Sequence, residues 1–117
     1  MDTVIWHNPR CTKSRQTLKL IQENGVEPTV RRYLEDPPSL EELGAALDLL
    51  GLDARGLMRR TEAIYRELGL KAVTDEAALR QAMVDNPKLI ERPIVFHGGK
   101  AAIGRPPETV LGLFGAG

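Results

Sequence analysis

The chain has 117 residues, which is the size of one domain and is enough to bury a core without disulfides. Its 16 Lys and Arg balance its 16 Asp and Glu, so there is no basic excess for binding nucleic acid or an anionic membrane. No apolar run approaches the ~20 residues of a membrane span, and the N-terminus lacks the pattern of a signal peptide. The single cysteine excludes an internal disulfide, and no Cys/His cluster suggests zinc. We therefore expect a reducing, cytoplasmic location.

The first third of the chain is typical of a β-α-β unit. An apolar run over 3–6 ends in a turn at 7–9 and predicts a strand. A helical repeat over 12–24 precedes Gly25, a favourable residue just after a helix. A second strand is expected over 29–34. The short helical crossover implies that the two strands run parallel.

Residues 38–88 are expected to form a helical insertion. Ser39 and Glu42 form a capping box that starts a helix ending at Gly51. A leucine stripe along that helix predicts its buried face. The stripe consists of Leu40, Leu43, Leu47 and Leu50. One or two short helices are then predicted over 53–68. A further helix, capped by Thr74 and with Leu79 and Met83 inward, is predicted over 75–84 and should stop at Asn86-Pro87.

The end of the chain is typical of a β-β-α unit. Two short apolar runs, 93–96 and 101–103, flank Gly98-Gly99, which is a hairpin signal. A final helix should start near Pro107-Glu108, because Pro suits the first helical position and Glu suits the first turn. The predicted order is β-α-β, a helical block, then β-β-α.

The single cysteine, Cys11, opens the first predicted helix. Free backbone N–H groups and the helix dipole stabilise a thiolate at this position, and a lowered pKa makes cysteine a nucleophile near neutral pH. His7, Arg10 and Arg15 are close in sequence and are expected to add positive field. The alternative is an inert core cysteine, the commoner fate of a lone thiol.

Three further arginines occupy positions that suit anion recognition. Arg92 and Arg105 each stand directly before a proline, and Arg59 follows an apolar pair in the helical block. An arginine held in a turn presents a pre-ordered fork to an oxyanion. The alternative for each is a solvated surface arginine or a structural salt bridge.

Six segments of the chain resemble the glutaredoxin-dependent arsenate reductases of the ArsC family, within the ArsC/Spx group. They occur in family-like order and spacing over nearly the whole chain. The first is His7-Asn8-Pro9-Arg10-Cys11-Thr12-Lys13-Ser14-Arg15, and the others are 33–39, 57–60, 67–70, 92–95 and 104–108.

The resemblance implies an α/β, thioredoxin-like fold with a mixed four-stranded sheet. The whole chain, 1–117, would be a single ArsC-type domain with a helical insertion at about 38–88. In thioredoxin-like folds a cis-proline before the third strand faces the active cysteine, and Pro93 is the matching residue.

The resemblance also implies the site residues. Cys11 would be the catalytic thiol, and His7 would tune it. Arg59, Arg92 and Arg105 would surround the thiol and bind the oxyanion, although Arg60 leaves the register of the middle arginine open.

The resemblance further implies the reaction and its partners. Arsenate is reduced to arsenite by two electrons, and Cys11 supplies only one of the two thiols that this requires. The second thiol would be glutathione, acting as a co-substrate, and glutaredoxin would clear the mixed disulfide. No metal or organic cofactor is expected, and the chain is expected to act as a monomer.

Three alternatives remain at this point. The first is a glutathione-dependent thiol reductase that acts on another oxyanion or on a disulfide, because fold and motif do not fix the substrate. The second is an Spx-like transcription regulator that binds RNA polymerase. It is less favoured, because the Cys-x-x-Cys redox pair of such regulators is replaced by Cys11-Thr12-Lys13-Ser14. The third is a thioredoxin-like binding module with an inert Cys11.

Overall fold

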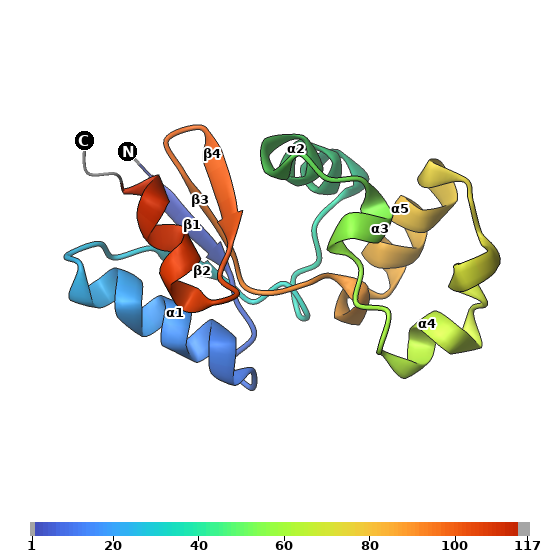
Figure 1. Cartoon of the computed structure of the whole chain (residues 1–117), viewed down its shortest axis with the longest axis horizontal. Helices are drawn as coiled ribbons and strands as arrows, with labels where there is room; N and C mark the ends of the chain where they lie inside the picture. Colours follow the sequence, from blue (N-terminus) through green and yellow to red (C-terminus); the bar gives the residue numbers. More distant parts are fainter. Residues whose placement is uncertain (1, 115–117) are drawn as a thin grey trace. The chain divides into compact units, whose positions relative to one another are not determined.

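The computed structural model describes residues 2–114, and the chain forms two compact units within it. Unit 1 combines the residues up to 36 with those from 92 onward, and unit 2 comprises Pro37–Glu91. All of the strands belong to unit 1 and helices α2 to α5 belong to unit 2 (Figure 1).

Unit 1 is built on a four-stranded sheet in the order β2-β1-β3-β4. Strand β1 runs parallel to β2 and antiparallel to β3, and β3 is antiparallel to β4. This confirms the mixed four-stranded sheet and both its β-α-β and β-β units. The strands are β1 Thr3–Trp6, β2 Thr29–Arg31, β3 Ile94–His97 and β4 Lys100–Ile103.

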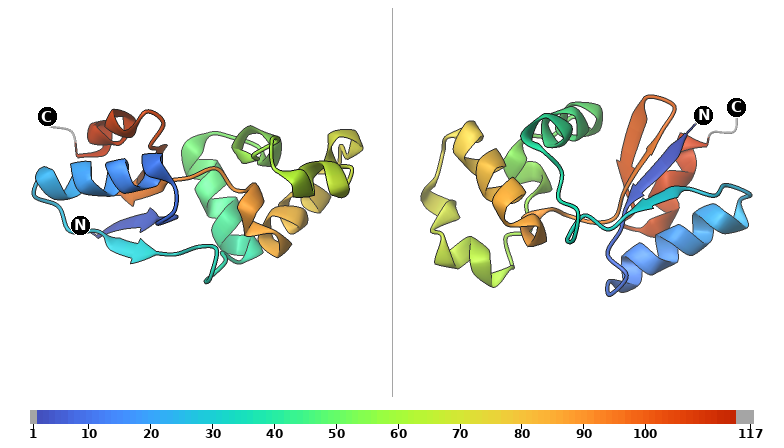
Figure 2. Two further views of the ribbon diagram at one scale, coloured as in Figure 1. Left: turned by 90° about the horizontal axis from the view of Figure 1, so that it is seen from below. Right: turned by 180° about the vertical axis from the view of Figure 1, so that it is seen from behind.

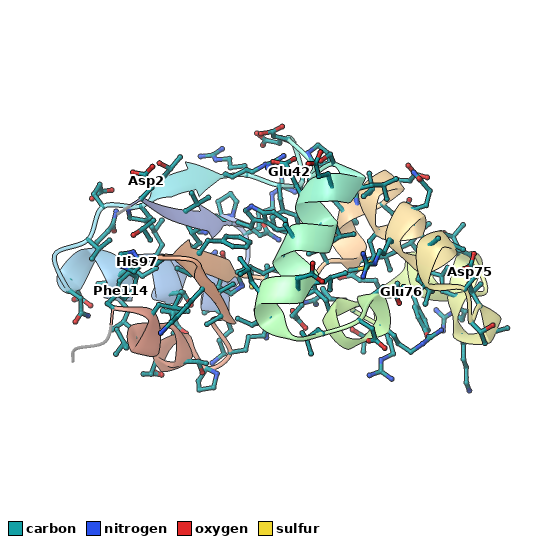
Figure 3. The ribbon with its side chains drawn as sticks, turned by 90° about the horizontal axis from the view of Figure 1, so that it is seen from above. Asp2, Glu42, Asp75, Glu76, His97 and Phe114 are labelled. Carbon is teal, nitrogen blue, oxygen red and sulfur yellow. The ribbon has the colours of Figure 1, made fainter. Side chains whose placement is uncertain are left out.

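Helix α1, Thr12–Glu23, and the 3₁₀ helix η3, Pro107–Leu113, cover the same face of this sheet (Figure 2). Four fully buried side chains join the helices to the sheet. At the far end of η3, Phe114 packs against His97 of β3 with ring centroids 4.8 Å apart (Figure 3). The final helix begins at Pro107 as predicted, but as a tight 3₁₀ helix. The four fully buried side chains that join α1 and η3 to the sheet are Ile5, Ile21, Val95 and Val110.

The strand register brings four chain segments to one end of the sheet. Trp6, the last residue of β1, pairs with Arg31 at the end of β2 and with Ile94 at the start of β3. Ile94 pairs in turn with Ile103, the last residue of β4. The segments that follow β1, β2 and β4, and the segment that precedes β3, therefore all meet at this end.

Unit 2 is a set of short helices. The predicted capping box of α2 is confirmed, because Ser39 and Glu42 exchange both of its hydrogen bonds. Glu76, labelled in Figure 3, accepts hydrogen bonds from the backbone N–H of Ala54 and from Arg80, so it links α5 to the start of α3. None of the helices within residues 2–114 is long and apolar enough to cross a membrane. The elements of unit 2 are α2 Leu40–Leu50, α3 Ala54–Leu57, α4 Ala63–Glu67, η1 Leu70–Ala72, α5 Glu76–Asp85 and η2 Pro87–Leu89.

Three details of the sequence prediction are wrong. The second strand ends at Arg31, because the next residues turn and Arg32 accepts backbone hydrogen bonds from the following segment. The N-cap position of α5 is Asp75, whose φ/ψ are extended and whose side chain makes no capping hydrogen bond, and not Thr74. Leu40 at the start of the leucine stripe is 47% exposed. Leu40 itself therefore does not contribute to the core of unit 2, whereas Leu43, Ala46 and Leu47 of the same helix are buried.

Candidate active site

Cys11 is the N-cap residue of α1. Its backbone is extended, with φ −93° and ψ 124°, and its carbonyl accepts the first helical hydrogen bond from the Arg15 N–H at 3.0 Å. Its own N–H donates to the Asn8 carbonyl at 3.0 Å, which closes the preceding turn. The thiol is half-buried. This geometry places the sulfur beside the unpaired N–H groups of the first helical turn, as the sequence predicted.

The surroundings of the thiol favour its ionised form. Burial raises the pKa of Cys11, but the Ser14 N–H and the Arg92 guanidinium lower it by more, with a further contribution from the Lys13 N–H. The net pKa lies below the ordinary value for cysteine. The shift therefore has the direction expected for a nucleophilic thiol and opposite to that expected for an inert core cysteine.

Two arginines that are distant in sequence reach this thiol. The Arg92 side chain hydrogen-bonds the Cys11 sulfur, and the Arg105 Nη2 donates to Sγ at 3.7 Å. The Arg105 Nε donates to the Arg92 carbonyl at 2.9 Å, which fixes the orientation of the guanidinium plane. The peptide bonds Arg92–Pro93 and Arg105–Pro106 are both cis, so Pro93 is the expected cis-proline.

Gly104 packs Arg105 tightly against the start of β3 and against α1. Its N–H donates to the Pro93 carbonyl at 2.9 Å, and its carbonyl accepts from the Thr17 hydroxyl at 3.4 Å. A Cβ at Gly104 would lie 2.5 Å from Thr17 Oγ1 and 2.8 Å from Pro93 Cγ. Only glycine fits this close approach, so the backbone next to Arg105 is firmly held.

His7 is buried and contacts Ser14. Its Nδ1 lies 2.6 Å from Ser14 Oγ, which also accepts a hydrogen bond from the Asn8 N–H at 3.0 Å. Burial, followed by the nearby charges of Arg32 and Arg15, lowers the pKa of His7. The imidazole is therefore neutral near pH 7, and the expectation that His7 adds positive field is wrong.

Ser14 is the site residue that the sequence analysis did not single out. Its hydroxyl holds the His7 ring and the Asn8 backbone, while its N–H lowers the thiol pKa. Its place three residues after Cys11 was the available signal, because an N–H at that position of a first turn faces the N-cap side chain. Arg15 has a bracing role, since its guanidinium donates to the Pro9 carbonyl at 2.9 Å and to Thr12 Oγ1 at 3.3 Å.

Arg59 belongs to unit 2 and takes part in ion pairs there. Its Nη1 donates to Glu91 Oε1 at 2.9 Å and its Nε donates to Glu62 Oε1 at 3.2 Å. Its backbone N–H donates to the Leu89 carbonyl at 2.7 Å. Arg60, the neighbouring arginine, is exposed. Within unit 2, Arg59 is thus the more firmly held of the two, and its role in binding an oxyanion stays a prediction.

Comparison with known proteins identifies the family of the chain. The ArsC family model matches residues 6–113. The chain is 58% identical over 113 residues to the protein YfgD of Escherichia coli K12, with 95% of each chain covered. It is 50% identical over 108 residues to an arsenate reductase of Neisseria meningitidis serogroup A, covering 91% of this chain and 92% of the relative.

A solved structure supports the fold. The arsenate reductase from Vibrio cholerae superimposes with a TM-score of 0.93 at 50% sequence identity, covering 97% of this chain and 98% of its own. This match and the observed sheet confirm the expected thioredoxin-like fold. From its sequence, its sheet and the cysteine–arginine cluster at the start of α1, the chain belongs to the ArsC family.

Proposed function

We propose that this chain reduces arsenate to arsenite with the Cys11 thiolate as nucleophile. The observation that carries the proposal is the contact of one thiol with two arginines, Arg92 and Arg105, at a helix N-terminus that lowers the thiol pKa. This combination suits a nucleophile that must approach an anion. The arsenate reductases among the relatives support the choice of substrate.

The arginines solve an electrostatic problem of the first step. Arsenate carries negative charge near neutral pH and would repel a thiolate. Guanidinium groups bind tetrahedral oxyanions through paired N–H donors and offset that repulsion in the transition state. Arg92 and Arg105 supply such donors beside the sulfur, and the family resemblance adds Arg59 as a third.

The electron balance then requires a second thiol. Cys11 attacks arsenic and expels hydroxide, which forms a sulfur–arsenic bond without changing the electron count at arsenic. Glutathione then supplies the second sulfur, so arsenic gains two electrons as each sulfur loses one and a mixed disulfide forms. Glutaredoxin attacks that disulfide and restores Cys11. The chain holds one cysteine, so the second sulfur comes from another molecule.

The proposed cycle needs no metal or organic cofactor, because thiols carry all of its electrons. It also needs a supply of reduced glutathione, which the cytoplasm maintains. A cytoplasmic location is therefore part of the proposal.

The test is turnover of arsenate with glutathione and glutaredoxin, each left out in turn. We expect arsenite only when the thiol system is complete, and none from a folded Cys11→Ser variant, because a hydroxyl stays protonated near neutral pH. Turnover by Cys11→Ser would overturn the assignment of the nucleophile. Reduction of a glutathione mixed disulfide but not of arsenate would point to the alternative thiol reductase.

A further inference from the structure

A groove of about 350 Å³ runs along α1 beside the start of η3. Both elements belong to unit 1 and cover the same face of its sheet (Figure 2). The volume lies within the range of small-ligand sites in proteins, which is roughly 300–1,000 Å³. Its lining includes Lys13, Lys19, Leu20 and Glu23 from α1, and Pro106 and Glu108 from the start of η3.

One end of this groove adjoins the candidate active site. Lys13 lies in the first turn of α1, two residues after Cys11, and its N–H is one of the groups that lower the thiol pKa. Pro106 directly follows Arg105, whose Nη2 is 3.7 Å from the sulfur. One end of the groove is therefore formed by residues that are close in the chain to Cys11 and Arg105.

The charged groups of the groove are spread along its length. Lys13, Lys19 and Glu23 project from α1 at different points along its length, and the ten residue steps from Lys13 to Glu23 span about 15 Å of helix. Glu108 faces them from η3. These four charged side chains are exposed, and no ion pair within residues 2–114 involves any of them. Their charges are available to a ligand.

We propose that this groove binds glutathione, the external thiol of the proposed reaction, and the inference rests on that proposed function. Glutathione is a tripeptide of about 10 Å when extended, with two carboxylates, one ammonium group and a central thiol. Two lysines and two glutamates complement those charges, and Leu20 and Pro106 give the backbone an apolar floor. Lys13 and Lys19 each hold one terminal carboxylate, and the central thiol extends from between them toward the arsenic bound to Cys11.

The experiment uses Lys19→Glu, because Lys19 is exposed and lies two turns away from the thiol. Lys100→Glu is the matched control, since Lys100 is an exposed lysine of unit 1 on the β3–β4 hairpin. The first readout is the Kd of S-methylglutathione, a non-reacting analogue, measured by calorimetry. The second is arsenate turnover with glutathione, and with 2-mercaptoethanol, a thiol without carboxylates.

We expect Lys19→Glu to raise the Kd of S-methylglutathione and the KM for glutathione roughly three- to tenfold. One exposed ion pair is worth up to about fivefold, and reversal adds repulsion. The KM for arsenate and the rate with 2-mercaptoethanol should not change, and Lys100→Glu should match the parent in every readout. Added salt should reduce the difference between parent and variant.

The binding readout separates failure of this inference from failure of the proposed function. An unchanged Kd and an unchanged KM for glutathione in Lys19→Glu would overturn the groove as the glutathione site, even where the chain reduces arsenate. A Kd that depends on Lys19 supports the groove, even where arsenate is not turned over. An effect of Lys19→Glu on the KM for glutaredoxin alone would overturn the proposal and assign the groove to that protein.

Discussion

Gly104→Ala tests how the fold positions Arg105. The added methyl carbon would lie 2.5 Å from Thr17 Oγ1, 2.8 Å from Pro93 Cγ and 2.9 Å from Thr17 Cγ2. All three distances are well inside van der Waals contact, and Thr17 is fully buried, so neither neighbour has free space to move. The backbone of Gly104, and Arg105 with it, must shift away from α1 and β3.

The magnitude follows from overpacking of a tight contact. Inserting a methyl into such a site costs about 1–3 kcal/mol of the free energy of unfolding. The same shift lengthens the contact of 3.7 Å between Arg105 and Cys11 and raises the KM for arsenate. Chemical denaturation of the parent and the variant measures the first effect, and steady-state kinetics measures the second.

Two further variants test the role of these contacts. Thr17→Ala removes two of the three clashing atoms, so the double variant should cost less than the sum of the two single changes. Gly112→Ala in η3 is the control, because a Cβ there meets nothing within 4 Å, and its effect should stay within about 0.5 kcal/mol. A Gly104→Ala protein as stable as the parent, or strict additivity with Thr17→Ala, would refute the argument.

Three other outcomes follow from the site. The alkylation rate of Cys11 should rise with pH, and the midpoint of that rise should lie below the ordinary pKa of a thiol, since the Ser14 N–H and Arg92 outweigh the effect of burial on the pKa of Cys11. A midpoint at or above the ordinary value would count against an activated thiol. Arg105→Lys should lower kcat/KM for arsenate roughly 10- to 150-fold at unchanged thermal stability. The reason is that a charge-assisted contact is worth ~1.5–3 kcal/mol and lysine lacks the paired N–H donors of the guanidinium group. Arg66→Lys, at an exposed arginine, is the control and should match the parent. Because the pKa of His7 is lowered in the folded chain, the unfolded chain takes up a proton at this residue before the folded chain does as the pH falls below 6.5. The free energy of unfolding should therefore decrease from about pH 7 to pH 5. A His7→Gln variant with an equally steep decrease would show that another group is responsible.

The local elements were predictable because they depend on neighbouring residues. Strand β1 and the start of α1 lie where the apolar run and the turn at 7–9 place them. The capping box at Ser39 and the hairpin at Gly98-Gly99 also follow from short-range chemistry, and Gly98 and Gly99 both have positive φ. The position of Cys11 at a helix start was predictable for the same reason.

The wrong prediction of the N-cap of α5 occurs where two local signals compete. Thr74 and Asp75 are both good N-cap residues, and their local preferences do not distinguish them. In the structure the backbone is extended at Asp75, and the first acidic residue of the helix, Glu76, reaches across to cap α3. The hydrogen bond from the Ala54 N–H to Glu76 joins residues 22 positions apart, so the residues close to Thr74 in the sequence do not reveal it.

The assembly of the site required the tertiary structure. Arg92 and Arg105 lie more than 80 residues after Cys11, and the sequence alone could not distinguish them from surface arginines. The sheet register brings both to the end of β1, and the packing of Gly104 on Thr17 and Pro93 orients Arg105. The neutral state of His7 likewise depends on its burial. The sequence alone thus determines the residues that can carry charge and nucleophilicity, because those are properties of single side chains. Their proximity and ionisation depend on long-range packing and burial, which exist only in the folded chain.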